Sequence, residues 1–289
     1  MNASTQLLEP KFPADLSVKL IGLGGVGGIV ARYLAIFLAA QPQSTRLVLI
    51  DGDAFEPSNA SRMLFGNCGN KAAVLHAELL PRIENSALTV LAIEEFVTSQ
   101  NIERLIQDGD IVILAVDNHT TRKLVSEHCG RLAHTCLLSG GNDGVANEPG
   151  AQMHRGTYGN VQVYLRRNGT DASPALTRYH PEIAHPTDHH PLEKNCTELL
   201  TSVPQILFTN MLVATSILGT LWLHLCDGLS YSEVAFDLAD ALMRPVPLPA
   251  PIRNVENVVA SPAVPSERPG KTRARAGRRR AAPIAKPGV

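Results

Sequence analysis

Residues 17–53 read SVKLIGLGGVGGIVARYLAIFLAAQPQSTRLVLIDGD, and this stretch decides the fold. The apolar run over 17–21 predicts a strand, and the glycines of 22–28 follow it as a turn. Residues 29–40 place apolar side chains at helical spacing, and 46–50 predict a second strand that ends in Asp51-Gly52-Asp53. A strand, glycine turn, helix and strand in this order predict a βαβ unit with two parallel strands.

The alternation of strands and helices continues along the chain. Helices are predicted over 71–83, 102–107 and 122–133, and strands over 88–93, 110–116 and 135–139. The run at 110–116 is nearly all apolar, which is typical of a parallel strand covered on both faces. A strand at 161–165, an apolar helix within 199–225 and a strand at 233–238 then follow. The sequence therefore predicts an α/β protein with a Rossmann-like, doubly wound, mainly parallel sheet and an antiparallel C-terminal extension.

Composition divides the 289 residues into three parts. A lead-in is expected at 1–16, one large domain at 17–244, and a disordered tail at 245–289. The polar, Pro- and His-rich stretch 166–198 is expected to be a mobile crossover loop inside the domain. The tail has nine basic and two acidic residues, a net charge of +7 that leaves −8 for the rest. An acidic body argues against nucleic-acid binding, except weakly through the tail.

The environment of the chain is predicted from its cysteines and its apolar segments. Five scattered cysteines without a C-x-x-C pair, and no signal-peptide pattern, favour a reduced, cytoplasmic protein. Residues 206–225 have no charged side chain, a length that can span a bilayer. Polar residues interrupt the segment and no aromatic belt or basic flank frames it, so we expect a buried helix and no membrane; membrane contact is the alternative.

The glycine loop predicts a nucleotide site. Gly22-Leu23-Gly24-Gly25-Val26-Gly27 fits G-x-G-x-x-G between a strand and a helix, where backbone amides and the helix dipole favour a phosphate. Asp51 ends the next strand 24 residues after Gly27, about where an acidic side chain accepts hydrogen bonds from a ribose. A tight turn without a ligand is the alternative reading.

Residues after the second strand favour ATP over a dinucleotide used for hydride transfer. Arg62 and Lys71 follow this strand, and a triphosphate under attack at its α-phosphorus needs such cations. Asp117 and Asn118 follow the predicted strand at 110–116, so they should reach the same crevice. A carboxylate there suits a Mg²⁺ ion that bridges phosphates. An NAD(P)-dependent oxidoreductase is the alternative enzyme.

Together these motifs resemble a known family. G-L-G-G-V-G, D-G-D with S-N-A-S-R, G-N-K-A and A-V-D-N-x-x-x-R are similar to the adenylation domain of the ThiF/MoeB/HesA and ubiquitin-activating-enzyme superfamily, over about residues 17–240. The stretches H-P-E-I-A-H-P and N-C-T-E-L-L most resemble ThiF-like proteins of PRTRC gene cassettes. The resemblance implies a homodimeric enzyme that uses Mg-ATP to adenylate the C-terminal glycine of a ubiquitin-like, β-grasp protein and releases pyrophosphate.

The resemblance also assigns roles by position. Glycines of the loop would cradle the phosphates, Asp51 would bind the ribose, three residues would face the phosphates, and Asp117 would hold Mg²⁺ with Asn118 beside it. These positions are Gly22, Gly24, Gly25, Gly27, Asp51, Asn59, Arg62, Lys71, Asp117 and Asn118. Arg122 matches a position that supports the site rather than contacting ATP. Since the carboxylate nucleophile is already ionised near pH 7, the reaction needs no general base.

The sequence departs from the family in ways that keep other readings open. Met63 stands where the family usually has Gln, and the interval from Arg62 to Lys71 is only nine residues, shorter than usual. Lys71 as a helix-surface lysine, or a nucleotide-binding scaffold without chemistry, are the alternatives. The N-terminus also lacks the arginine that many relatives lend to the partner subunit.

Zinc and a thioester are the remaining questions. Zinc is not expected, because both C-x-x-C pairs of the family are absent; the alternative is a site of His180, His185, His189, His190 and Cys196. Cys196 is the best candidate for a thioester, since a helix start lowers a thiol pKa, although a structural role is the simpler reading. Cys68 is a weaker candidate, and the other three cysteines are expected in the core.

Overall fold

The computed structural model describes residues 7–57, 60, 63–146, 154–193 and 205–248. All of them belong to the first of two compact units, Met1–Pro251. The predicted tail from residue 249 onward lies outside the described residues.

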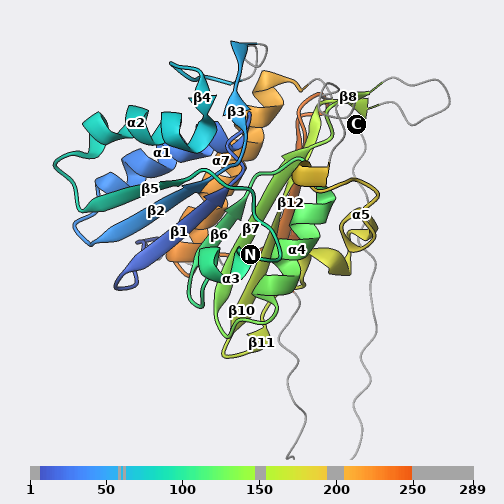
Figure 1. Cartoon of the computed structure of the whole chain (residues 1–289). Coiled ribbons are helices and arrows are strands. Elements are labelled where there is room, and N and C mark those ends of the chain that lie inside the picture. The colour runs from blue at the N-terminus through green and yellow to red at the C-terminus, as the bar shows by residue number, and fades with distance from the viewer. Residues whose placement is uncertain (1–6, 58–59, 61–62, 147–153, 194–204, 249–289) are drawn as a thin grey trace, which may run out of the picture. The chain divides into compact units, whose positions relative to one another are not determined.

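A nine-stranded mixed sheet forms the centre of this unit (Figure 1). Its order is β13-β12-β10-β7-β6-β1-β2-β5, and β11 pairs with β10. The parallel strands are β1 (Leu16–Ile21), β2 (Thr45–Ile50), β5 (Leu88–Ile93), β6 (Ile111–Leu114) and β7 (Thr135–Asn142). The antiparallel part consists of β10 (Tyr158–Arg167), β11 (Thr170–Asp171), β12 (Tyr231–Asp237) and β13 (Leu242–Pro247).

Helices cover both faces of the sheet (Figure 1). One face packs against α1 (Gly27–Ala39), α2 (Lys71–Ile83) and α7 (Leu207–Leu225). The other packs against α3 (Ile102–Leu105), α4 (His119–Cys129), the 3-10 helix η2 (Leu176–Arg178) and α5 (Pro181–Ala184). The 3-10 helix η3 (Pro191–Glu193) follows, and two small antiparallel sheets pair β3 (Ala54–Phe55) with β4 (Gly69–Asn70) and β8 (Val145–Ala146) with β9 (His154–Arg155).

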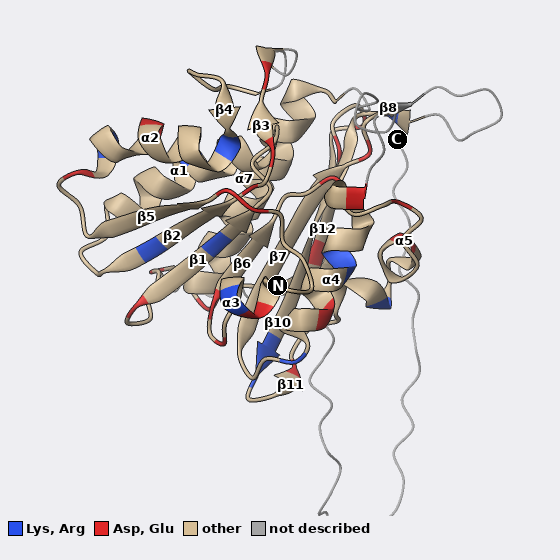
Figure 2. Cartoon of the chain, in the orientation of Figure 1, with Lys and Arg blue, Asp and Glu red and all other residues tan. Residues whose placement is uncertain are grey.

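The apolar strands form this sheet because both of their faces are buried. In β6, Ile111 and Ile113 join the core under α1, α2 and α7, whereas Val112 and Leu114 join the core under α3 and α4. Successive side chains of a strand point to opposite faces, so a continuous apolar run fills two cores at once. Neither β6 nor β7 carries a charged residue, whereas β1, β2 and β10 each carry at least one (Figure 2).

The predicted fold class is confirmed, with differences at the ends of elements. The predicted helix over 122–133 instead occupies 119–129, and the predicted strand over 110–116 is only 111–114. Residues 166–193, predicted as irregular, contain β11, η2, α5 and η3. The β13 strand runs to Pro247, past the start predicted for the disordered tail at Pro245; pairing with β12 orders these residues.

The apolar helix α7 is long and apolar enough to cross a membrane by length and composition alone. In the structure it packs on β7, β10 and α1 through buried residues such as Val213, Ala214 and Ile217. Its opposite face is open, with Phe208 and Met211 exposed by 67% and 47%. One side of α7 therefore belongs to the core, as predicted, and the other is an uncovered apolar surface.

Candidate functional site

The centre of the sheet brings the predicted motifs to one edge. β1 lies between β2 and β6, so the chain order reverses beside β1 and the parallel strands end at one common edge of the sheet. The glycine loop follows β1, Asp51 follows β2, and Asp117 follows β6 after two intervening residues. In open α/β sheets, ligands bind at this position.

The glycine loop packs directly against the ends of the neighbouring strands. The amide of Gly22 donates to Ile50 O of β2 at 3.0 Å, and Gly22 has a φ of +85°. A Cβ on Gly22 would lie 2.9 Å from the carbonyl of Ala115, which follows β6. Helix α1 starts at Gly27 without a side-chain cap. The amides of Gly28 and Ile29 donate to Gly24 O and Val26 O, so an anion would be bound by amides of the loop before them.

Asp51 links this loop to the end of β2. The carboxylate is buried and accepts hydrogen bonds from the amides of Leu23 at 2.6 Å and Asp53 at 2.8 Å. Burial raises the pKa of Asp51, and the positive charge of Lys71 works against this rise. Each oxygen retains a lone pair after these bonds, so it can also accept from a ribose hydroxyl.

Lys71 is a buried cation at the start of α2 rather than a surface lysine. Its ammonium lies 3.0 Å from the half-exposed carboxylate of Asp53, while its own side chain is only 8% exposed. The amide of Lys71 donates to Asp53 O, so backbone and side chain both tie the start of α2 to the turn after β2. The alternative of a helix-surface lysine is therefore wrong.

Asn70 fixes the start of α2, a role that the motif analysis missed. Its Oδ1 accepts from the amides of Ala72 and Ala73, and its Nδ2 donates to Asp51 O at 2.9 Å. An Asn directly before a helix is the usual sequence signal for such a cap. Through Asn70, α2 and Lys71 are positioned against the end of β2.

The two residues after β6 differ sharply in their surroundings. Asp117 is exposed and makes no hydrogen bond or ion pair within the described residues. Asn118 is buried, and its Oδ1 accepts from the amide of Thr121 as the N-cap of α4. The structure thus leaves the Asp117 carboxylate open at the sheet edge, while the Asn118 side chain starts the helix.

Arg122 lies beneath this turn as a buried guanidinium. It donates to Ser139 Oγ at 2.7 Å, Val116 O at 2.7 Å and Gly140 O at 3.0 Å. Glycine at 141 makes this possible, because a Cβ there would lie 2.5 Å from the guanidinium. Burial lowers the pKa of Arg122 to about 10, against the attraction of Asp117, so the group stays charged near pH 7.

The segment after η2 also reaches this edge. Asp188 accepts hydrogen bonds from the amides of His119 and Thr120, the first two residues of α4. Burial raises the pKa of Asp188, but these hydrogen bonds lower it more, and its pKa is below the ordinary value. Farther along the sheet, His180 contacts Glu182 at 3.0 Å and Glu233 at 3.1 Å.

Several predicted site residues lie outside the described part of the chain: Asn59, Arg62 and Cys196. Among the described cysteines, Cys68 is exposed and Cys129, Cys136 and Cys226 are buried, as predicted for the core. No cluster of three or more His, Cys, Asp or Glu suited to a metal occurs among the residues described.

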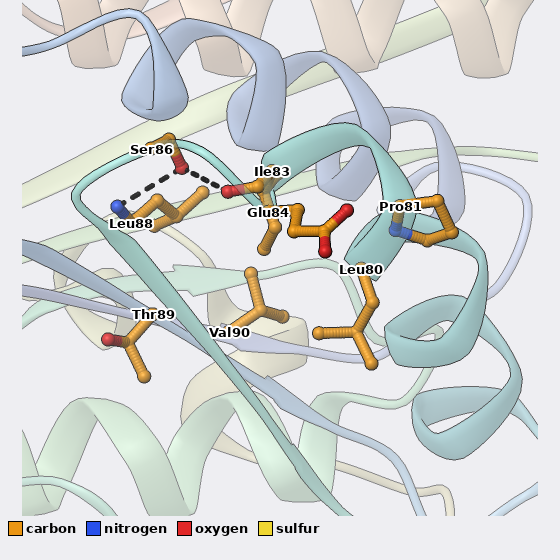
Figure 3. Close-up of a pocket in the computed structure, with 8 residues that line it drawn as sticks. All are labelled: Leu80, Pro81, Ile83, Glu84, Ser86, Leu88, Thr89 and Val90. Carbon is orange, nitrogen blue, oxygen red and sulfur yellow. Dashed lines mark hydrogen bonds between the residues drawn. The ribbon is translucent and has the colours of Figure 1, made fainter.

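A pocket elsewhere on the surface is separate from these residues (Figure 3). It lies between the end of α2 and β5 and is lined by side chains such as Leu80, Leu88 and Val90. None of the predicted site residues lines it; they follow the ends of β1, β2 and β6 instead.

Known proteins share both the sequence and the fold. The chain is 28% identical over 137 residues to Protein HesA, heterocyst, of Trichormus variabilis, covering 44% of this chain and 49% of that protein. It is 32% identical over 175 residues to adenylyltransferase and sulfurtransferase MOCS3 of Drosophila yakuba, covering 56% and 35%. The chain thus spans about half or less of these relatives.

The fold is similar to that of E. coli MccB solved with ATP. The TM-score is 0.58 at 17% identity, over 82% of this chain and 65% of MccB. A comparison with protein families matches residues 14–244 to the ThiF family. That match includes the glycine loop, Asp51, Lys71 and Asp117, and the chain therefore belongs to the ThiF family.

Proposed function

We propose that this protein is an ATP-dependent adenylyltransferase that activates the C-terminal glycine carboxylate of a ubiquitin-like, β-grasp protein. The observation that carries the proposal is the convergence at one sheet edge of an uncapped helix start, the buried Asp51, the buried cation Lys71 and the open carboxylate of Asp117. An α/β scaffold alone would not require a buried lysine or an unpaired acid at this edge.

The relatives support the same chemistry. Their names include adenylyltransferase and sulfurtransferase MOCS3, a ubiquitin-like modifier-activating enzyme 5 and a SAMP-activating enzyme E1. ATP was bound in one of the MccB structures of similar fold. Because the chain spans only part of these proteins, the substrate is assigned here from the family and remains part of the proposal.

The reaction we propose breaks a phosphoanhydride bond of ATP and forms a mixed anhydride between the carboxylate and AMP. A carboxylate oxygen of the partner's C-terminal glycine attacks the α-phosphorus of ATP, and the bond from this phosphorus to the bridging oxygen breaks. Pyrophosphate leaves with the electron pair, and the products are an acyl-adenylate and pyrophosphate. No proton moves, since the carboxylate is ionised near pH 7.

Both reactants are anions, so the site must supply positive charge. Amides of the glycine loop before α1 would bind phosphate oxygens, and Asp51 would accept from the ribose. Lys71 donates to Asp53 and has further N–H groups that can reach a phosphate. Arg62 and Asn59 would add to this group from the segment outside the described residues.

The Asp117 carboxylate fits a Mg²⁺ ion in its chemistry. Its oxygens are hard ligands, and no described residue competes for them through a hydrogen bond or an ion pair. When bound, Mg²⁺ would neutralise charge on the triphosphate. Arg122 holds Val116 O, the carbonyl directly before Asp117, and so keeps this acid at the strand end.

Pyrophosphate–ATP exchange tests the proposal. With a β-grasp protein that ends in glycine, the wild-type protein should exchange labelled pyrophosphate into ATP, and Asp117→Ala should lower the rate by about 100-fold or more. Glu127→Ala, which removes an exposed acid at the other end of α4, is the matched control and should leave the rate unchanged.

Other outcomes separate the alternatives. If Asp117→Ala exchanges at the wild-type rate, Asp117 does not hold the metal. ATP binding without exchange, even with the cognate partner, would indicate a nucleotide-binding scaffold. Binding of NAD(P)H in place of ATP in calorimetry would indicate an oxidoreductase.

A homodimer is also part of this proposal. Helix α1 packs beside α7 (Figure 1). Tyr33 and Ile36 of α1 are 60% and 52% exposed, and Phe208 and Met211 of α7 are also exposed. A second copy of the chain would bury this apolar surface. In sedimentation analysis the wild type should be a dimer and Phe208→Glu a monomer, whereas Tyr179→Glu, 66% exposed on the opposite side of the sheet, should remain a dimer.

We further propose that the acyl-adenylate passes to the thiol of Cys196. The thiolate would attack the activated carbonyl, AMP would leave, and a thioester would form. A covalent adduct with the partner should then disappear in reducing sample buffer and be absent in Cys196→Ala. Cys68→Ala is the control, and an adduct that survives Cys196→Ala would assign the step to another residue.

A further inference from the structure

An ion pair of α1 and α2 holds the loop that leads from β3 toward β4. Arg32 of α1 lies 2.7 Å from Glu78 of α2, and both side chains are largely shielded, with 22% and 26% exposed. The Arg32 guanidinium also donates to Gly28 O at 2.9 Å and to Leu64 O. One side chain therefore joins the start of α1, the loop and α2.

Glu78 binds the same loop from the other side. Its Oε1 accepts from the amide of Gly66 at 2.6 Å, and its Oε2 accepts from Arg32. The Arg32 guanidinium lies 5.4 Å from the centre of the Phe65 ring, which stacks on Phe55 at 4.8 Å. Residues 64–66 are thus each held by Arg32, by Glu78 or by an aromatic contact.

Burial of apolar side chains does not explain why residues 64–66 are held in one conformation. The Leu64 side chain is 78% exposed, so it contributes almost nothing to the core. Of these residues only Phe65 packs against the core. Without Arg32 and Glu78, residues 64–66 would be attached to the core through the Phe65 ring.

The held segment lies against the nucleotide loop. A Cβ on Gly24 would be 3.5 Å from the terminal methyl of Met63, and a Cβ on Gly28 would be 3.8 Å from the Phe65 ring. Arg32 itself bonds the carbonyl of Gly28, in the first turn of α1. Movement of residues 63–66 would therefore change the surroundings of the glycine loop.

From these contacts we infer that Arg32 and Glu78 are positioning residues of the nucleotide site. They clamp Met63–Gly66 between α1 and α2, and this fixes the segment against the glycine loop. The inference rests on the proposed function, because it takes the glycine loop to be the ATP site. Neither residue contacts the reacting atoms, so their effect passes through the loop.

The test combines ATP binding with hydrogen exchange. Arg32→Met removes the guanidinium donors of the clamp, and Glu78→Gln keeps an acceptor for Gly66 but loses the ion pair. We expect faster amide exchange over residues 63–70 in both variants. ATP should bind about 10- to 100-fold more weakly to Arg32→Met, because the glycine loop would lose its support; each tenfold corresponds to about 1.4 kcal/mol of binding free energy. Arg32→Lys should be intermediate.

Arg104→Met is the matched control. Arg104 makes a two-pronged ion pair with Glu95 at 2.9 Å and 2.7 Å, away from this loop. It should change neither the exchange of residues 63–70 nor the ATP affinity. A role of Arg32 in stability alone would lower the melting temperature and leave the ATP affinity of the folded protein unchanged.

The outcomes distinguish a failure of the positioning role from a failure of the proposed function. Unchanged ATP affinity in both Arg32→Met and Glu78→Gln, with normal binding by the wild type, would overturn the positioning role alone. Unchanged exchange over residues 63–70 would show that the clamp does not hold the segment. Failure of the wild type to bind ATP would overturn the proposed function, and the role of the clamp would fall with it. If Arg32→Met does not fold, Glu78→Gln and Arg32→Lys give the result.

Discussion

Replacement of Arg122 by Met should destabilise the protein by about 2 kcal/mol. The change removes the charged donor from Val116 O and Gly140 O, and a buried acceptor that loses such a donor costs about 1–3 kcal/mol, or about 2–6 kcal/mol for both. Removal of the buried cation also relieves its desolvation, which offsets part of this cost and leaves a net loss near the lower end of the range, about 2 kcal/mol. A net loss of about 2 kcal/mol would lower the melting temperature by about 4–8 °C.

The same change should also slow catalysis. Val116 O is held directly before Asp117, so Arg122→Met should let this acid shift and lower pyrophosphate exchange by about 10²-fold, provided that the proposed function is correct. Lys123→Met is the control at the next helix position, where the ammonium lies 4.0 Å from Glu127 on the surface. This substitution should alter stability by less than about 0.5 kcal/mol.

Thermal unfolding followed by circular dichroism measures the stability of Arg122→Met. Pyrophosphate–ATP exchange at saturating ATP measures its catalytic rate. Gly141→Ala tests the same contact from the opposite side, since its Cβ would lie 2.5 Å from the guanidinium. Both variants should melt below the wild type. An Arg122→Met protein that melts within about 1 °C of the wild type would refute the reasoning, because about 2 kcal/mol corresponds to several degrees.

Two further predictions concern the glycine loop and pH. A Cβ on Gly27 would overlap Gly22 O, so Gly27→Ala should lower the free energy of unfolding in urea by about 1–3 kcal/mol. Gly219 is open in the middle of α7, so Gly219→Ala should raise this free energy by about 0.5–1 kcal/mol. Equal effects of the two substitutions would contradict the packing described. Burial lowers the pKa of His180, but two neighbouring carboxylates raise it more, to above its ordinary value. This stabilisation is present below about pH 6.5 and is lost as pH rises through the raised pKa. The stability difference between wild type and His180→Gln should therefore shrink from about pH 6 to about pH 8, and a difference that grows would contradict the contact.

The central part of the fold could be predicted because its signals are local and repeated. The helix over 71–83 and the strand over 88–93 have the predicted bounds. Apolar periodicity and glycine or asparagine punctuation are sufficient there, since one face or both faces of each element enter the core. The strand β13 was missed because two prolines and an exposed surface give no strand signal; its order comes from pairing with β12.

The candidate site was predictable to the extent that its residues follow strands. Asp51 and Asp117 lie after β2 and β6, so topology alone brings them to one edge. The burial of Lys71 could not be read from its place in an amphipathic helix, because it depends on the turn at Asp53. No sequence motif marks Arg32 and Glu78, because their contacts are long-range. Arg32 contacts Leu64, 32 residues away, and Glu78, 46 residues away. The likeness to PRTRC-type proteins stays a prediction.

The outermost strand β13 has a consequence for self-association of the sheet. Pro245 and Pro247 stand two residues apart, so the amide protons that both lack would fall on one side of the strand. The amide of Leu248 donates to Ser230 O beside β12, so by alternation positions 245 and 247 face away from β12. A strand of another molecule that paired with this edge would lack two backbone hydrogen-bond donors. The two prolines thus disfavour edge-to-edge aggregation of the sheet at β13.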